Sequence, residues 1–200
     1  MSRTRDDDAC PGALQTHTAA DGELARIRLP GGVMSADQME TVALAAIDFA
    51  ASSLELTSRG NVQIRGVRDT ASVAELLTAS GLLPSASHER VRNIVASPLA
   101  GRNGGLCDTR ELVTGLDSAL QRDPLLAQLP GRFLFGIDDG RGDISGLGAD
   151  VGLHALDAST AALLLGGRDT GVRIDVADAS DELVDVATRF IEIRGKSWRV

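Results

Sequence analysis

The side chains best suited to binding chemistry lie in one short stretch, residues 54–67. Its letters, LELTSRGNVQIRGV, place Arg59 at a Gly-Asn turn, and Gln63 and Arg65 at alternate positions beyond it. Alternate residues of a strand point to the same face, so Gln63 and Arg65 should lie side by side. Guanidinium groups bind carboxylates through paired hydrogen bonds. The stretch therefore predicts a receptor for carboxylates or a small anion, with a solvent-exposed strand face as the alternative.

The same stretch has the pattern of a β-hairpin. Apolar residues alternate with polar ones on both sides of Gly60-Asn61, as Leu54 and Leu56 before the turn and Val62 and Ile64 after it. Alternation of this kind around a Gly-Asn pair indicates two strands joined by a tight turn.

Further elements surround this hairpin in an order that suggests a ferredoxin-like domain. We expect a strand at 24–29, a helix at 36–51, a helix at 70–80 and an extended segment at 91–96. Together with the hairpin these make the order β-α-β-β-α-β. The domain is expected to span residues 21–97, after a flexible lead-in over residues 1–20.

A second domain is predicted over residues 105–200, beyond a glycine-rich hinge. It should contain a helix at 108–122, a strand at 132–137, three further strands between 150 and 176, and a helix at 180–194. The expected fold class is therefore α+β, with a ferredoxin-like subdomain followed by an α/β domain.

Three segments, taken in order, resemble the nitrite and sulfite reductase superfamily. Residues 57–66, TSRGNVQIRG, resemble its T-x-R-x-x-x-Q-x-x-G signature. Residues 92–98, RNIVASP, resemble its R-N-[IV]-x-x-[ST]-P segment, and residues 129–133, LPGRF, resemble its LP-x-K/R-F segment. The Asp-Asp-Gly at 138–140 favours the precorrin-3B synthase branch, which acts in cobalamin biosynthesis.

The resemblance implies that basic and amide side chains hold an anionic tetrapyrrole. Arg59 and Arg92 match positions that bind ring carboxylates and the substrate anion, and Arg132 matches the first residue of a basic pair. Leu134 occupies the second position of that pair, which weakens a sulfite or nitrite assignment. The predicted binding residues are Arg59, Gln63, Arg65, Arg92, Asn93 and Arg132. Asp138 and Asp139 are interpreted as a turn pair.

Composition narrows the possible partners. The formal net charge is −8, which argues against a nucleic-acid partner. Residues 54–102 nevertheless contain six arginines and only four acidic residues, a local excess of positive charge that suits an anionic small molecule. We find no apolar run that could serve as a signal peptide or membrane span, so we expect a cytoplasmic protein with no membrane partner.

The cysteine content limits the redox chemistry. Full-length relatives are expected to carry a 4Fe-4S cluster and possibly sirohaem or non-haem iron. A four-iron cluster normally takes four thiolates, and this chain has two cysteines, Cys10 and Cys107. We expect that this chain alone ligates none of these cofactors and has no turnover, because the resemblance covers only the first half of a family member.

Three functions therefore remain open. The first is a precorrin-3B synthase-like protein whose iron chemistry is supplied by a C-terminal half. The second is half of a sirohaem-dependent nitrite or sulfite reductase. The third is a non-catalytic module that binds a tetrapyrrole or a partner. The internal pseudo-symmetry of the family implies that a C-terminal half, or a second copy of this chain, covers an apolar face.

Overall fold

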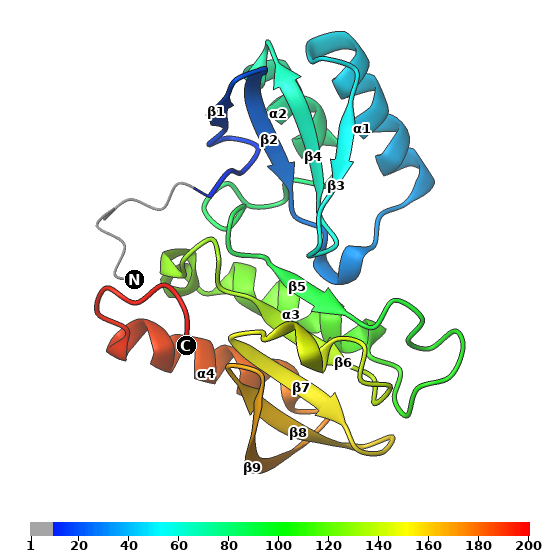
Figure 1. Ribbon diagram of the computed structural model, residues 1–200, viewed down its shortest axis with the longest axis vertical. Coiled ribbons are helices and arrows are strands. Elements are labelled where there is room, and N and C mark those ends of the chain that lie inside the picture. Colours follow the sequence, from blue (N-terminus) through cyan, green and yellow to red (C-terminus); the bar gives the residue numbers. More distant parts are fainter. Residues whose placement is uncertain (1–9) are drawn as a thin grey trace. The chain divides into compact units, whose positions relative to one another are not determined.

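The computed structural model describes residues 10–200, and the chain divides into two compact units (Figure 1). The first unit runs to Arg28 and resumes at Met34–Arg90. The second unit comprises Leu29–Val33 and Val91–Val200. The short crossing segment contains a 3-10 turn, η1 (Pro30–Gly32).

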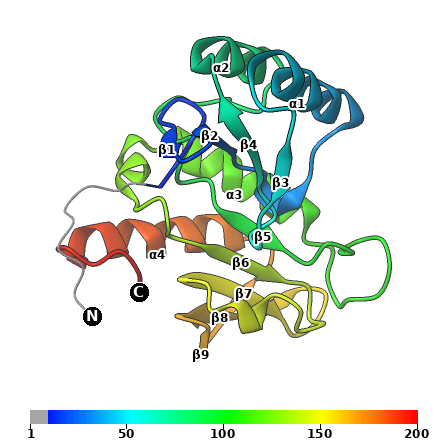
Figure 2. The ribbon, with the colours of Figure 1, turned by 45° about the horizontal axis from the view of Figure 1, so that its top comes forward.

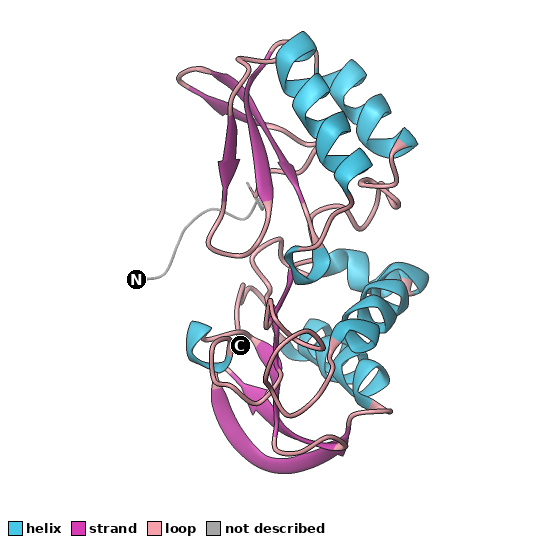
Figure 3. Cartoon of the chain, turned by 90° about the vertical axis from the view of Figure 1, so that its right-hand side faces the viewer, coloured by secondary structure: helices cyan, strands magenta, loops and turns pink. Residues whose placement is uncertain are grey.

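The first unit is an antiparallel sheet covered on one face by two helices. The strands are β1 (His17–Ala19), β2 (Gly22–Ile27), β3 (Leu54–Leu56) and β4 (Val62–Val67), in the order β1-β2-β4-β3. Helices α1 (Ala36–Phe49) and α2 (Thr70–Ala79) lie side by side on one face (Figures 2 and 3). Ser35 and Gln38 form a capping box that begins α1, and the Asp69 side chain caps α2.

One face of this first sheet is apolar and the other carries polar side chains. Residues that are paired in register point to the same face, so each row can be assigned to one of the two. Ala25 pairs with Ile64, and both are fully buried. The next register row places Arg26 opposite Gln63 and Gln63 opposite Glu55. Since successive side chains point to opposite faces, this polar row lies on the face away from Ala25 and Ile64.

The second unit is a five-stranded mixed sheet in the order β5-β6-β7-β8-β9. Parallel pairing joins β5 (Ile94–Ala96), β6 (Phe135–Asp138) and β7 (Val151–Ala155). Antiparallel pairing adds β8 (Thr160–Leu165) and β9 (Arg168–Asp175). Two helices, α3 (Arg110–Arg122) and α4 (Ala179–Ile193), complete the unit together with the 3-10 turns η2 (Pro124–Gln128) and η3 (Ser145–Leu147).

The core of the second unit lies between its helices and one face of its sheet. Phe133 contacts Phe135 edge-on at 5.1 Å between ring centroids, and Phe190 of α4 at 4.9 Å. Leu116 of α3 and Leu183 of α4 are fully buried in the same cluster. A second, smaller cluster joins Val95, Leu134, Ile144 and Ala149. Because Val95 alternates with Ile94 and Ala96, which belong to the large core, this cluster lies on the opposite face.

The α+β class and the central hairpin are confirmed, but one predicted strand lies in a different sheet. The segment expected to close the first sheet, residues 91–96, forms β5 and pairs with β6 in the second unit. The fourth strand of the first sheet is instead β1, which falls within the predicted lead-in. Ile94–Ala96 is buried at all three positions, which is typical of a parallel strand covered on both faces. None of the helices in residues 10–200 combines the length and apolar content needed to cross a membrane.

Candidate functional site

Arg65 and Gln63 take part in a polar network on the open face of the first sheet. Arg65 donates two hydrogen bonds to the carboxylate of Asp21, at 2.8 and 2.9 Å. Gln63 donates to Glu55 at 2.9 Å and accepts from the guanidinium of Arg26. The network crosses three strands and the loop before β2. Arg65 therefore agrees with the alternative interpretation of a solvent-exposed strand face, because the carboxylate of Asp21 already accepts the hydrogen bonds of its guanidinium.

Arg59 is placed by the tight turn between β3 and β4. The Thr57 hydroxyl accepts hydrogen bonds from the backbone N–H groups of Arg59 and Asn61, at 3.4 and 3.1 Å. Gly60 follows with a φ of 70°, which glycine adopts without a steric penalty. The turn leaves the Arg59 side chain half-buried and close enough to Arg28 for the two positive charges to interact.

Arg28, which follows β2, is the residue that the sequence analysis did not single out. Its side chain is 3% exposed, and its Nε donates a 3.4 Å hydrogen bond to the carbonyl of Arg90. Its two terminal nitrogens have no hydrogen-bond partner among residues 10–200. Burial, together with the positive charges of Arg26 and Arg59, lowers the pKa of Arg28 to about 10. The charge of Glu89 acts on this guanidinium in the favourable direction, and a bound anion would add acceptors for the two terminal nitrogens.

Sequence reasoning missed Arg28 because the alternation of residues 24–29 assigns it to a polar strand face. No local signal distinguishes a buried arginine from an exposed one on such a strand. The one available hint was the close spacing of Arg26 and Arg28, which makes this strand more basic than its neighbour β4.

The predicted binding residues of the second unit have internal partners. Arg92 donates to both carboxylate oxygens of Asp117, at 2.6 and 2.8 Å. The amide of Asn93 donates to the carbonyl of Gly131 at 3.0 Å, and the Asn93 carbonyl accepts from Phe135. Arg132, next to Gly131, is exposed. The structure therefore places Asn93 beside the backbone that precedes Arg132, while Arg92 is held separately by Asp117 of α3.

The aspartates after β6 form a cluster with the composition of a cation site. Carboxylate oxygens of Asp138, Asp139 and Asp143 lie within 4.8 Å of one another, and His154 Nδ1 is 3.6 Å from Asp138. Ser145 links the histidine to this group, since its hydroxyl lies 2.8 Å from His154 Nδ1 and donates to Asp138 at 3.0 Å.

The oxygens of this cluster are already used within the chain. Asp138 accepts four backbone N–H groups, from residues 140, 142, 144 and 145, at 2.8 to 3.0 Å. Burial opposes its ionisation, but these hydrogen bonds outweigh burial and lower the pKa of Asp138 to about 2. Arg141 donates to both oxygens of Asp139, at 2.7 and 2.8 Å. The arrangement is that of a structural turn.

The cysteines do not fit the iron-sulfur cluster that the resemblance implies. Cys10 lies in the first unit and Cys107 in the second, and the chain contains no other cysteine. Burial and the nearby carboxylates of Asp108, Asp139 and Asp157 raise the pKa of the Cys107 thiol, which disfavours the thiolate that ligates iron. Four thiolates for a cluster are not present in these 200 residues.

Comparison with known proteins finds similarity to nitrite and sulfite reductases and to precorrin-3B synthase. The family described as the nitrite/sulfite reductase ferredoxin-like half domain matches residues 17–79. Among solved structures, the NirA protein of Mycobacterium tuberculosis shares the fold, with a TM-score of 0.73 and 20% identity over 88% of this chain and 37% of that one. A precorrin-3B synthase from Sinorhizobium sp is 32% identical over 167 residues, which are 81% of this chain and 36% of the relative.

These matches indicate a class of protein. The chain resembles the nitrite/sulfite reductase superfamily, whose ferredoxin-like half domain matches residues 17–79. Within that superfamily it is similar to precorrin-3B synthase. The chain spans little more than a third of the length of both relatives, at 36% and 37%.

Proposed function

We propose that this chain is a precorrin-3B synthase-like protein that binds a carboxylate-bearing tetrapyrrole. The observation that carries the proposal is the Arg28 guanidinium, which is 3% exposed and has no hydrogen-bond partner for its terminal nitrogens within residues 10–200. Arg59 adds a second positive charge beside it. Two guanidiniums that repel one another are stabilised by an anion between them, and tetrapyrroles of the corrin pathway carry several carboxylates.

The other predicted residues are expected to differ in how much they contribute to ligand binding. Arg59 contacts the ligand together with Arg28, while Gln63 aligns Arg26 on the sheet. Within the second unit, Arg92, Asn93 and Arg132 remain proposed anion contacts considered separately, and Arg92 binds a carboxylate only in exchange for Asp117. Arg65 makes the weakest contribution, because Asp21 already occupies its fork.

The proposal assigns binding, and not redox chemistry, to these 200 residues. The two cysteines lie in different units and do not make a cluster site, so the oxidoreductase activity of the family requires ligands from elsewhere. We propose that the isolated chain shows no oxygen-dependent consumption of its tetrapyrrole. The lack of a cluster site also favours the third function considered above, a module that binds a tetrapyrrole without turnover.

A sirohaem-dependent reductase is less well supported. The second residue of the family's basic pair is Leu134, which is buried in a small apolar cluster with Val95, Ile144 and Ala149. This position supplies no charge for a sulfite or nitrite ion. Loss of one charge-assisted hydrogen bond weakens anion binding by about 1.5–3 kcal/mol.

Titration with uroporphyrin, an octacarboxylate tetrapyrrole, tests the proposal through the change in porphyrin fluorescence. We expect saturable binding that weakens at least ten-fold in Arg28→Met and in Arg59→Met. The control is Arg173→Met, because Arg173 is exposed and paired with Asp169 in the second unit. Uroporphyrin octamethyl ester, which lacks the charges, should not bind. Equal affinity of the wild type and Arg28→Met would overturn the proposal, and preferential binding of sirohaem would favour the reductase.

A further inference from the structure

The buried carboxylate of Glu89 holds one loop of the first unit, residues 12–15, which we call the Glu89 loop. Glu89 is 7% exposed. Its Oε2 accepts the backbone N–H groups of Ala13 at 2.7 Å and Leu14 at 2.9 Å, and its Oε1 accepts that of Gln15 at 3.1 Å. Three charge-assisted hydrogen bonds from consecutive residues determine the path of this loop.

Gly12 shows how closely this carboxylate fits the loop. A Cβ atom at position 12 would lie between 2.4 and 2.6 Å from the Glu89 carboxylate, so no other residue fits while Glu89 stays in place. Gly12 also donates its N–H to the carbonyl of Gln15, which closes the turn. The Glu89 carboxylate therefore packs directly against the backbone of Gly12, in a turn that is closed by its own hydrogen bond.

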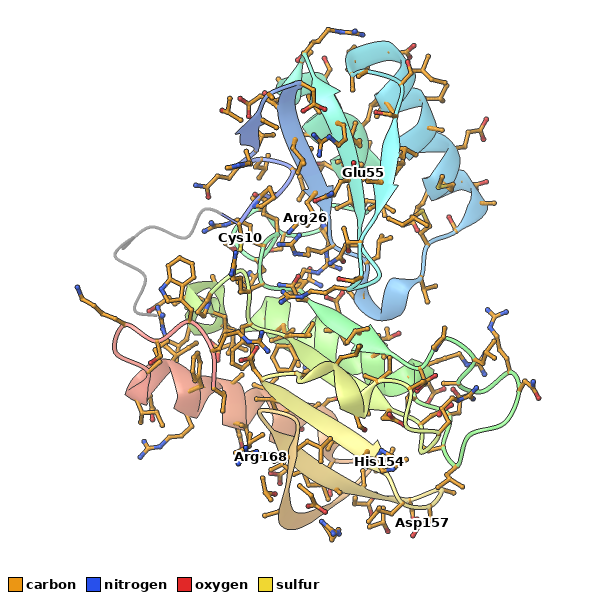
Figure 4. All side chains as sticks on the ribbon, in the orientation of Figure 1. Cys10, Arg26, Glu55, His154, Asp157 and Arg168 are labelled. Atoms are coloured by element: carbon orange, nitrogen blue, oxygen red, sulfur yellow. The ribbon has the colours of Figure 1, made fainter. Side chains whose placement is uncertain are left out.

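The Glu89 loop places Cys10 beside Arg28. The carbonyl of Gly12 accepts a 2.9 Å hydrogen bond from the backbone N–H of Arg26, so the two segments run next to each other (Figure 4 labels Cys10 and Arg26 there). Cys10, two residues before Gly12, lies close enough to Arg28, two residues after Arg26, for the two side chains to interact electrostatically. Cys10 is 9% exposed, and the Glu89 carboxylate also acts on the Arg28 guanidinium.

We propose that Glu89 is a positioning residue for the Arg28 anion site, holding residues 12–15 so that the Cys10 thiol forms part of the wall of that site. The anion is a carboxylate, and this inference rests on the proposed function. Glu89 does not contact the ligand, because its oxygens are directed to the backbone of the loop. The side chain that shares the site with Arg28 is Cys10. The accessibility of its thiol should therefore depend both on the position of the Glu89 loop and on whether a ligand is bound.

Alkylation of Cys10 by iodoacetamide, a neutral reagent, tests this arrangement in a Cys107→Ser background, where Cys10 is the only thiol. We expect slow labelling that uroporphyrin slows at least ten-fold further. Glu89→Gln removes the charge that holds the loop and should raise the labelling rate at least ten-fold. Uroporphyrin should protect Cys10 in that variant by no more than two-fold. The matched control is Glu75→Gln, an exposed glutamate of α2 in the same unit, which should leave the rate unchanged.

A second variant keeps the test decisive if Glu89→Gln does not fold. Gly12→Ala displaces the loop by a steric clash and retains the buried carboxylate, and it should raise the Cys10 rate in the same way. Labelling of Cys107 in a Cys10→Ser background, in the other unit, should not change in either variant, which excludes general unfolding.

The outcomes separate this inference from the function on which it rests. An unchanged Cys10 rate in both Glu89→Gln and Gly12→Ala overturns the positioning role, even where uroporphyrin still binds. Direct binding of uroporphyrin that leaves Cys10 unprotected overturns the place of Cys10 in the site. If uroporphyrin does not bind at all, the proposed function fails, while faster labelling of the variants still supports the role of Glu89 in holding the loop.

Discussion

Both carboxylate oxygens of Asp117, on α3, accept hydrogen bonds from the guanidinium of Arg92, at 2.6 and 2.8 Å. The side chains are 7% and 17% exposed, so the pair is largely removed from water. Gln121, one turn further along α3, also donates to Asp117 at 3.0 Å. The arginine that the sequence motif assigns to ligand binding is thus held in place by a residue outside the motif.

Removal of Asp117 should be costly for this reason. Asp117→Ala leaves the Arg92 guanidinium buried without its partner, and we expect the free energy of unfolding to fall by about 3–5 kcal/mol. Urea denaturation at pH 7 measures the effect. The control is Asp169→Ala, which breaks the exposed pair with Arg173 and should cost less than about 1 kcal/mol. Similar small losses in both variants would contradict the structural role of Asp117.

Arg28 should destabilise the free protein. Its pKa is lowered to about 10 from an ordinary value of 12.5, so the folded chain disfavours the charged form throughout the range below pH 10. Arg28→Met removes this charge, and we expect the free energy of unfolding to rise by about 1–3 kcal/mol at pH 7. The difference should shrink as the pH rises above 10.

The wild type and Arg28→Met also allow anion binding to be measured through its effect on thermal stability. Sodium sulfate should raise the melting temperature of the wild type more than that of Arg28→Met, because an anion that binds only the folded state stabilises it. Arg173→Met corrects for the general effect of sulfate on proteins. An equal rise in all three proteins would show that no anion binds at Arg28.

Asp138 should make stability depend on acidic pH. Four backbone hydrogen bonds offset the effect of burial and lower its pKa to about 2, from 3.8 when unfolded. Its stabilising contribution is therefore complete above pH 4 and is lost as the pH falls through about 2. Asp138→Asn should reduce stability by about 2 kcal/mol at pH 7 and by much less at pH 2.

Acid and urea denaturation of the wild type and Asp138→Asn, followed by circular dichroism, measure this difference. The matched comparison is Asp185→Asn on α4, an exposed aspartate whose substitution should have only a small effect on stability. A loss for Asp138→Asn that stays constant from pH 7 to pH 2 would contradict the assignment of the titrating group.

Two glycines opposite each other in the second sheet leave no space for a side chain. Gly136 of β6 pairs with Gly152 of β7, and a Cβ at position 152 would lie 2.7 Å from the Gly136 carbonyl oxygen. Because that oxygen belongs to the backbone, Gly152→Ala should destabilise the second unit by about 1–3 kcal/mol. Gly146→Ala is the control, since nothing lies within 4 Å of its Cβ. Thermal unfolding of both variants would show the contrast, and equal melting temperatures would contradict it.

Much of the local structure follows from residues only a few positions apart. The alternation around Gly60-Asn61 predicted the hairpin of β3 and β4, and Ser35 predicted the start of α1. Helices α3 and α4 were expected within two residues of their observed limits. Strand alternation, turn residues and helix caps are short-range effects, so the sequence alone could determine them. The ordered motifs were enough to indicate the superfamily.

The tertiary structure alone decided how these elements pair and which charges are free. Residues 94–96 join β6 of the second unit, which no short-range pattern specifies. Arg92 meets Asp117 across 25 positions of sequence, Arg65 meets Asp21 across 44, and Ala13 meets Glu89 across 76. Arg28 stands out only through its burial and through its two terminal nitrogens, which lack a hydrogen-bond partner within residues 10–200. The charge of a residue is visible in its letter, but the water it loses and the partners it gains depend on parts of the chain that meet only after folding.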